Sequence, residues 1–210
     1  NSVLNQFICE IRDSNWQSDR MRFRKNIERI GEVVAYELSK HLNFRNKKVK
    51  TPMGSLTMDL PSDQLVIASV LRAGLPFHQG FLNYFDHAGN AFVTAYRSYK
   101  NETEFSIEIE YVSTPRLDGK VLILVDPMLA TAKSLVGVYD HLKKFGIPAF
   151  THFCAVISAR EGVNYLAKNI TGKNSMLWTA AIDPELNSKS YIIPGLGDAG
   201  DLAFGDKVDL

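Results

Sequence analysis

The segment from Leu122 to Ser134 reads LILVDPMLATAKS and joins an apolar strand to side chains suited to holding a phosphate. After Asp126 the chain is rich in small residues that let the backbone approach a ligand: Ala130, Thr131, Ala132 and Ser134. Free N–H groups at the start of a following helix, with about half a positive charge, favour a phosphate there. The hydroxyl groups and the ammonium of Lys133 add further donors. A strand followed by an ordinary capped helix explains this loop equally well when it is taken alone.

Two matches to nucleotide-binding motifs fail on closer reading. Residues 127–134 have the spacing of the G-x-x-x-x-G-K-S loop, but Pro127 and Ala132 replace both glycines. Because proline fixes φ and has no N–H, we do not expect a glycine cradle. Residues 195–200 read GLGDAG, but Pro194 stands where a dinucleotide fingerprint needs a strand. We expect a glycine-rich turn that presents main-chain donors and acceptors to a flat ligand.

Two arginines occupy loops after predicted strands. Arg72 follows the apolar run 65–70, and Arg97 follows the predicted strand 91–96. A single arginine at a strand end is usually an ordinary surface charge. Two of them beside a phosphate loop favour binding of phosphate oxygens, which a guanidinium fork suits at any working pH.

A sheet flanked by helices must position these loops. Apolar runs at 65–70, 91–96, 121–125, 150–157 and 176–182 predict strands, and most alternate with helical patterns. Such an order indicates an α/β fold with a parallel sheet covered on both faces, whose ligands bind beyond the carboxyl ends of the strands. The other predicted elements are a helix from Asp19, capped by Asp19 or Ser18, a hairpin around Met53-Gly54, a glycine turn and a helix within 71–85, a half-exposed strand at 104–112, and helices at 135–145 and 161–170.

The composition narrows the class of protein. The 210 residues, 45% of them hydrophobic, suffice for one domain with a large core. A net charge of +1 gives no support for a nucleic-acid or membrane surface, and no apolar run approaches the roughly 20 residues of a membrane span. Two cysteines and five histidines form no zinc-binding pattern, and they fit a cytoplasmic location.

Four segments in fixed order resemble the uracil phosphoribosyltransferases. They are VLRAGL (70–75), AYR (95–97), VLILVDPMLAT (121–131) and YIIPGLGDAGD (191–201). The last two are the specific ones, and the resemblance extends over essentially the whole chain. It implies the type I phosphoribosyltransferase fold, as a single domain over residues 1–210. It also implies a small hood formed by residues near 183–210 with the N-terminal segment, and an extended β-arm at about 98–114.

The resemblance implies that the chain joins uracil to 5-phosphoribosyl 1-diphosphate (PRPP), giving UMP and diphosphate in pyrimidine salvage. Asp198 and Arg72 are then catalytic. Uracil is held by Ile192, Gly197, Asp198 and Ala199, and Mg²⁺ arrives with PRPP, with a possible water bridge to Asp198. A homodimer or a higher homo-oligomer is expected. The residues implied in PRPP binding are Arg72, Arg97, Asp126, Pro127, Met128, Leu129, Ala130, Thr131, Ala132, Lys133, Ser134 and Asp198.

Three departures from the family pattern leave alternatives open. The family usually has ATGGS where this chain has ATAKS, and GDAGDR where it has Leu202. After Arg97 it usually continues Asp-Pro-Glu-Thr, which is Ser-Tyr-Lys-Asn here. Ala132 is tolerable unless its φ must be positive. A non-catalytic nucleotide sensor on the same fold is the second hypothesis, and a transferase for another base is the third.

Overall fold

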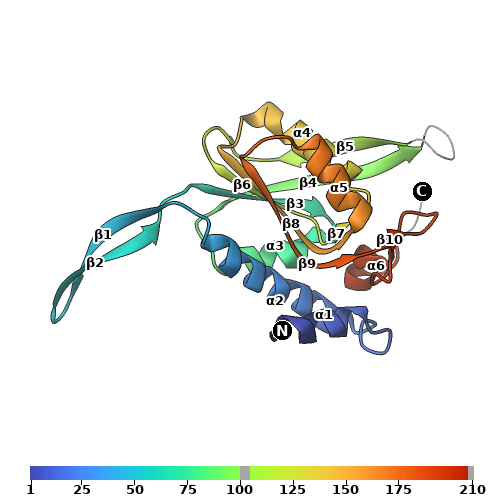
Figure 1. Cartoon of the computed structure of the whole chain (residues 1–210), viewed down its shortest axis with the longest axis horizontal. Helices are drawn as coiled ribbons and strands as arrows, with labels where there is room; N and C mark the ends of the chain where they lie inside the picture. Colours follow the sequence, from blue (N-terminus) through green and yellow to red (C-terminus); the bar gives the residue numbers. More distant parts are fainter. Residues whose placement is uncertain (100–104, 208–210) are drawn as a thin grey trace.

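The computed structural model describes residues 1–99 and 105–207, and for residues 96–99 and 105–108 it describes the backbone alone. Figure 1 shows the helices and strands that the described residues form. In order they are α1 (Leu4–Arg12), α2 (Arg20–Ser39), β1 (Phe44–Thr51), β2 (Gly54–Pro61), β3 (Leu65–Leu71), α3 (Gly74–Leu82), β4 (Gly89–Tyr99), β5 (Phe105–Ser113), β6 (Val121–Val125), β7 (Met128–Leu129), α4 (Lys133–Leu142), the 3₁₀ turn η1 (Lys143–Phe145), β8 (Phe150–Ala159), α5 (Arg160–Asn169), β9 (Ser175–Asp183), β10 (Glu185–Leu186), β11 (Ile192–Ile193) and α6 (Ala199–Phe204).

The long helix α2 shows how the apolar spacing becomes packing. Asp19 is the N-cap, and its side chain accepts a hydrogen bond from the Arg22 amide, so of the two predicted caps Asp19 is the correct one. The residues of the predicted stripe are all buried: Phe23, Ile27, Ile30, Val34 and Leu38. The helix crosses α3 so closely that a Cβ on Gly80 would lie 2.2 Å from the Glu28 carbonyl oxygen, which explains a glycine inside α3.

The main sheet has seven strands and is mostly parallel, as predicted. Its order is β5-β4-β3-β6-β8-β7, and β9 pairs with β8. Only β5 runs antiparallel among these pairs, against β4, at one edge. Every residue of the central strand β6 is buried. A strand buried on both faces must be apolar at each position, which is why its sequence lacks alternation.

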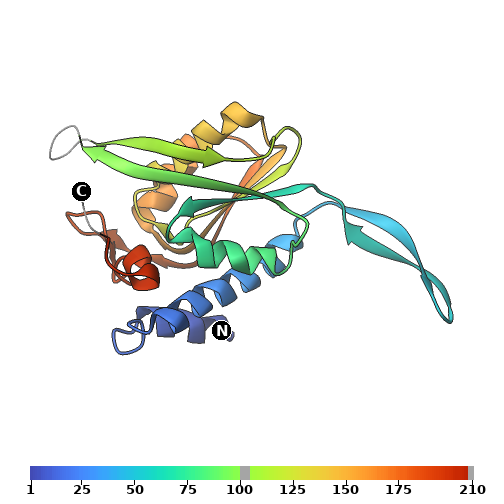
Figure 2. The same ribbon diagram turned by 180° about the vertical axis from the view of Figure 1, so that it is seen from behind.

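Alternate residues of β6 feed two separate cores. Ile123 and Val125 face a core shared with α1, α2, α3 and the 192–203 segment. Leu122 and Leu124 face a second core shared with α4 and α5. Figures 1 and 2 show the resulting layers, with α4 and α5 on one face of the sheet and α2 and α3 on the other.

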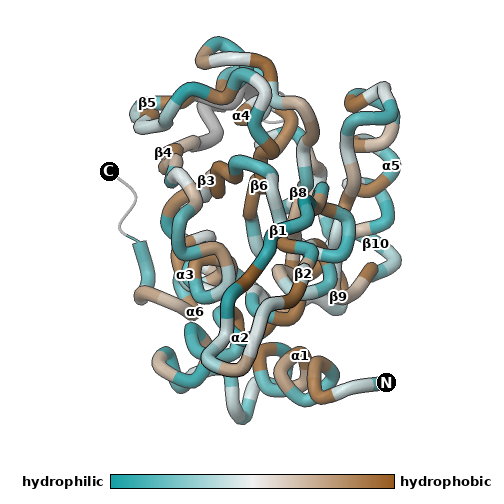
Figure 3. The backbone as a smooth tube through the Cα atoms, turned by 90° about the vertical axis from the view of Figure 1, so that its left-hand side faces the viewer, coloured by the Kyte–Doolittle hydropathy of each residue, from teal (hydrophilic) through white to brown (hydrophobic). Residues whose placement is uncertain are grey.

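The hairpin predicted around Met53-Gly54 is formed by β1 and β2, and it projects from the body of the molecule (Figure 1). It belongs to no larger sheet. Because β3 begins only a few residues after β2, the hairpin leaves from the amino ends of the strands, away from their carboxyl ends. Figure 3 shows it from the front, with α2 beneath the sheet and α4 above it.

Other expectations have a mixed outcome. The strand predicted at 104–112 is β5, although residues 100–104 of the predicted arm at 98–114 lie outside the described residues.

Helix α1 was not predicted. Its Ile11 is fully buried, and Arg12 in its last turn contacts Asp183, at the end of β9. Among the described residues, no helix combines the length and the apolar character that crossing a membrane requires.

Candidate active site

The candidate site lies where the two central strands end. β3 and β6 are parallel neighbours, with Ser69 opposite Val125, so their following loops leave the same edge of the sheet. The connection after β3 continues into α3 on one face, and the connection after β6 continues into α4 on the other (Figure 1). Such a divergence is a topological switch point, the usual position of a ligand crevice in this class of sheet.

Arg72 ties the loop after β3 to the glycine-rich turn near the C-terminus. Its Nη2 donates to Asp201 Oδ1 and to the Gly205 carbonyl oxygen, each at 3.0 Å. The two charged side chains are 43% and 29% exposed, so an incoming anion can reach the guanidinium. The Leu71–Arg72 peptide bond that precedes it is cis. Two segments predicted to share a site are thus in direct contact.

Asp198 begins helix α6 as its N-cap. Its Oδ1 accepts hydrogen bonds from the amides of Gly200 and Asp201, at 2.8 and 3.1 Å. Its Oδ2 lies 3.7 Å from Lys207 Nζ. Oδ1 therefore stabilises the start of α6. The contact of Oδ2 with Lys207 is weaker, and a ligand can displace it.

The loop after β6 divides into a half that is held by its own hydrogen bonds and a half whose amides have no described acceptor. In the first half Asp126 Oδ1 accepts from the Met128 amide at 3.1 Å, and Ala130 donates to the Met128 carbonyl at 3.1 Å. Pro127 is buried, and Leu129 pairs with Ser158 in the sheet.

In the second half, no described residue accepts a hydrogen bond from the amides of Thr131, Ala132 and Ser134. These amides stand at the start of α4, where a helix leaves N–H groups without partners within the helix.

Ala132 has the conformation that makes the family's glycine understandable. Its φ is +62°, in the left-handed region, and it directly precedes α4. An L-residue with a Cβ pays roughly 1–2 kcal/mol for that conformation. Lys133, the first residue of α4, is exposed, and its amide lies 3.4 Å from Thr131 Oγ1. The sequence departs from the family's glycine at a position where φ is positive, so the replacement by alanine affects the backbone energy there.

The segment predicted to hold uracil is a tight, well-anchored turn. Ile192 is buried in β11, Gly197 has a φ of +98° and is exposed, and Ala199 is buried at the start of α6. Gly195, between them, donates its amide to Asp183 Oδ2 at 2.9 Å. The turn therefore exposes main chain at Gly197, beside Asp198, while Ile192, Leu196 and Ala199 are buried.

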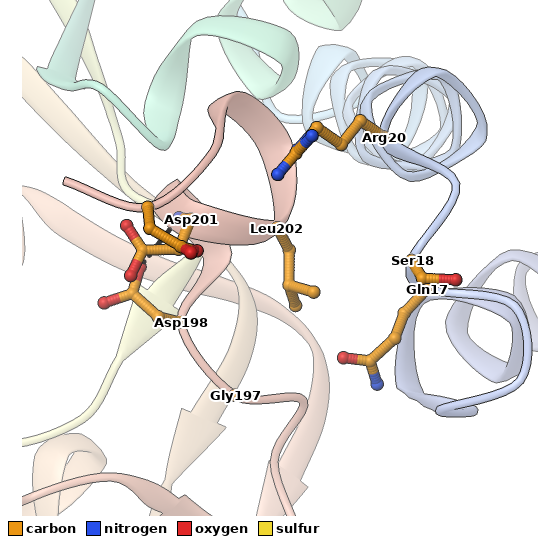
Figure 4. Close-up of a pocket in the computed structure, with 8 residues that line it drawn as sticks. Gln17, Ser18, Arg20, Gly197, Asp198, Asp201 and Leu202 are labelled. Carbon is orange, nitrogen blue, oxygen red and sulfur yellow. Dashed lines mark hydrogen bonds between the residues drawn. The ribbon is translucent and has the colours of Figure 1, made fainter.

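A cleft of about 330 Å³ opens beside this turn (Figure 4). Arg20 and Gln17 extend toward it from α2 and the loop before α2, and Leu202 extends toward it from α6. The other lining residues are Ser18, Gly197, Asp198, Asp201 and Asp206. Arg20 thus presents a guanidinium to this cleft. Leu202, which also lines the cleft, occupies the position at which the family usually has arginine.

Sequence reasoning missed the residues that approach this turn from the N-terminal helices. Gln17, Ser18 and Arg20 carry no motif, and no local pattern connects them with residues near 200. Arg12 and Asp183 form an ion pair across 171 positions of sequence. The predicted site residue Arg97 lies in β4, with its backbone opposite Ile107, and the role of its side chain lies outside the described part of the structure.

Cys154 is fully buried in β8. Burial raises the pKa of its thiol well above the usual value, which keeps it protonated and unreactive.

Comparisons with solved structures define the class of protein. The fold matches a hypoxanthine phosphoribosyltransferase from Staphylococcus aureus with a TM-score of 0.53 at 14% identity, over 82% of this chain and 85% of that one. A protein of Aquifex aeolicus, AQ2163, matches with a TM-score of 0.87 at 29% identity, over 100% of this chain and 97% of that one. Together with the switch-point loops, the fold is that of the type I phosphoribosyltransferases.

Sequence comparisons then give the family. The family model for uracil phosphoribosyltransferase matches residues 1–206. A uracil phosphoribosyltransferase of Porphyromonas gingivalis is 50% identical over 207 residues, which cover 99% of this chain and 95% of the relative. One from Methanothermobacter thermautotrophicus is 37% identical, over 91% of this chain and 87% of the relative. The chain belongs to the uracil phosphoribosyltransferase family, and its activity is the transfer of a phosphoribosyl group to uracil.

Proposed function

We propose that PRPP binds across the β3–β6 switch point, with its 5′-phosphate on the second half of the loop from Asp126 to Ser134. The amides of Thr131, Ala132 and Ser134 support this, because no described residue accepts a hydrogen bond from them and they stand at the positive end of α4. The hydroxyl groups of Thr131 and Ser134 and the Lys133 ammonium add donors around the phosphate. Asp126 shapes the first half of the loop by accepting the Met128 amide, and in this proposal the ribose binds beside its carboxylate.

We propose that uracil lies against the turn from Ile192 to Ala199. Uracil presents an N–H donor between two carbonyl acceptors, and main-chain groups at Ile192 and Ala199 complement that order. The positive φ of Gly197 supports the proposal, since it turns the main chain outward beside Asp198. Cytosine reverses the pattern at two positions, so buried groups would lose their partners, and exclusion should be strong.

The transfer exchanges one bond for another at the ribose C1 atom. The bond to diphosphate breaks, the bond to the uracil ring nitrogen forms, and the proton of that nitrogen leaves. Arg72 and Arg97 stabilise the negative charge of the departing diphosphate. Asp198 faces the opposite side of the sugar and helps the ring nitrogen to attack by accepting its proton, directly or through water.

The proposed mechanism includes Mg²⁺, which prefers oxygen ligands and keeps several waters. Its charge, when it is bound, offsets the charge of the diphosphate oxygens. No protein atom would bind the ion directly; a water ligand of the ion would reach Asp198 Oδ2, because Oδ1 is committed to two amides. Within the described ranges no three His, Cys, Asp or Glu residues gather into a metal-binding group. The substrate and water therefore supply most of the coordination.

A homo-oligomer is also part of the proposal. The register of the β1–β2 hairpin places Val49, Leu56, Met58 and Leu60 on one face, and Leu56 and Met58 are 47% and 45% exposed. A lone two-stranded hairpin is only marginally stable in water, so its apolar face needs a cover. A second copy of the chain meets this need, and the same hairpin of each copy supplies the contact.

The remaining parts of the proposal concern the hood, the arm and the location. The contacts of Arg12 with Asp183 and with Gly195 support a hood made of residues 183–210 and the N-terminal segment, within one domain over 1–210. The arm at 98–114 includes residues outside the description, and it stays a prediction. The two cysteines, Cys9 and Cys154, are free, which supports a reducing cytoplasmic location.

The observation that carries the proposal is the hydrogen bond from Arg72 to Asp201, because it unites the loop after β3 with α6, the helix that directly follows the proposed uracil turn. A coupled assay of diphosphate release with uracil and PRPP tests it. We expect release that depends on both substrates and yields UMP. Binding of UMP with no product above a blank would point instead to a nucleotide sensor. Product with adenine, guanine or xanthine in place of uracil would point to another base.

A further inference from the structure

An ion pair joins the first helix of the chain to the entrance of the proposed uracil turn. Arg12 Nη1 and Nη2 lie 2.9 Å from Asp183 Oδ2 and Oδ1, so the guanidinium and the carboxylate meet as two parallel hydrogen bonds. The side chains are 21% and 8% exposed. A two-pronged pair of this kind fixes geometry more firmly than a single contact between point charges.

Both members of the pair also hold Gly195. Asp183 Oδ2 accepts the Gly195 amide at 2.9 Å, and Arg12 Nη1 donates to the Gly195 carbonyl oxygen at 3.2 Å. Gly195 has a φ of +56°, and a Cβ there would lie 2.1 Å from the Ile192 carbonyl oxygen. Hydrogen bonds therefore hold both the amide and the carbonyl of Gly195, at the middle of the main chain between Ile192 and Gly197.

We infer that Arg12 and Asp183 are positioning residues that hold the main chain of the uracil turn in the arrangement that reads the base. The inference rests on the proposed position of uracil. A base read by main-chain groups depends on the backbone being fixed, because no rotamer change can correct a displaced amide or carbonyl. Displacements of about 1 Å at a site can cost about a hundredfold in rate.

The contacts of the pair predict a selective effect. Among the described residues, the side-chain hydrogen bonds of Arg12 and Asp183 join the first helix to residues 183 and 195 and include neither Arg72 nor the loop from Asp126 to Ser134. Weakening the pair should therefore change uracil binding and base selection while leaving the grip on PRPP in place.

A second ion pair of the N-terminal helices provides the matched control. Arg22 Nη1 lies 3.5 Å from Glu10 Oε2, which links α2 to α1 without touching the 183–199 segment. If α1 mattered only as a general support, loss of either pair would have similar effects. If the clamp on Gly195 matters, only the Arg12–Asp183 pair should change uracil kinetics.

The experiment compares Arg12→Lys, Asp183→Asn and Arg22→Gln with the unchanged chain in steady-state assays, varying uracil and PRPP separately. Lysine keeps the charge of Arg12 but loses the fork, and asparagine keeps the size of Asp183 but loses one acceptor. We expect KM for uracil to rise by about tenfold or more in both clamp variants, with KM for PRPP within about twofold. In both clamp variants the ratio of kcat/KM for uracil to kcat/KM for cytosine should fall. Arg22→Gln should have the same kinetic constants as the unchanged chain.

Several outcomes would overturn the inference. They are an unchanged KM for uracil in Arg12→Lys and Asp183→Asn, equal rises in KM for both substrates, or an equal effect of Arg22→Gln. Unfolding of both clamp variants, seen as a lost thermal transition, would assign the pair to global stability and also overturn it. A lack of uracil transfer by the unchanged chain would instead refute the proposed function, so the two failures are distinguishable.

Discussion

Arg72 Nη2 lies 3.0 Å from Asp201 Oδ1, although the two residues are 129 positions apart in the sequence. The contact places an arginine from a strand end against an acid of α6, the helix that follows the glycine-rich turn. It gives the guanidinium an anionic partner that a diphosphate can replace. The proposed chemistry depends on this juxtaposition, and the following predictions test its parts.

Asp198→Asn separates the charge of Asp198 from its role in the fold. Asparagine is as good an N-cap as aspartate, so α6 should persist and the unfolding temperature should change little. Turnover should fall by at least about a hundredfold, because the group that accepts the uracil proton is lost. Asp140→Asn, which removes an exposed acid paired with Lys143, is the control and should leave turnover unchanged. Equal turnover in Asp198→Asn and the unchanged chain would remove Asp198 from catalysis.

Glycine at position 132 should remove the backbone strain that the left-handed conformation of Ala132 causes. Ala132→Gly and Ala130→Gly each delete one methyl group and gain the same backbone freedom, but only Ala132 has a positive φ. The free energy of unfolding of Ala132→Gly should therefore exceed that of Ala130→Gly by about 1–2 kcal/mol. Urea unfolding of the two variants measures the difference. Equal losses of stability would mean that Ala132 carries no strain.

Lys133→Gln tests whether the lysine in place of the family's glycine helps to bind the donor. Because Lys133 is exposed, its charge should contribute modestly, and KM for PRPP should rise roughly two- to fivefold at low salt. The difference should shrink as salt is added, since screening weakens exposed charge pairs. Lys143→Gln, at the far end of α4, should leave KM unchanged. A salt-independent difference would indicate that Lys133 acts through loop conformation instead.

His152 should make stability depend on pH. It is 1% exposed, accepts a hydrogen bond from Trp178 Nε1 at Nδ1, and burial, with a smaller contribution from His41, lowers its pKa to about 4. An unfolded chain binds a proton near pH 6.5, so acidification from there toward pH 4 favours unfolding, by up to about 3 kcal/mol.

His152→Gln keeps an acceptor for Trp178 and should flatten this part of the stability curve. Urea unfolding at pH 7, 6 and 5 measures it, with exposed His87→Gln as the control. Parallel curves for the unchanged chain and His152→Gln would exclude His152 as the source.

The sequence predicted the sheet and most helices because apolar periodicity reports burial directly. The residues Leu4, Phe7, Ile8 and Ile11 carry the same helical spacing, so α1 was predictable and was missed. The short strands β7, β10 and β11 carry no such signal, because two residues cannot show a period. They depend on tertiary pairing alone.

The site was predictable in its loops and less so in its connections. Motifs indicated Arg72, Asp198 and the 126–134 loop, but pairing of Arg72 with Asp201, or of Arg12 with Asp183, depends on the three-dimensional arrangement of distant segments. The sequence analysis likewise raised the question of whether φ at Ala132 is positive, but it could not answer it. Alanine gives no local sign of a left-handed turn.

A crystal structure of the chain with UMP tests the central claim most directly. The account predicts that the phosphate accepts hydrogen bonds from the amides of Thr131, Ala132 and Ser134, with the pyrimidine ring against Ile192 and Ala199. A phosphate bound away from those amides, or a ring outside the 192–199 turn, would contradict it.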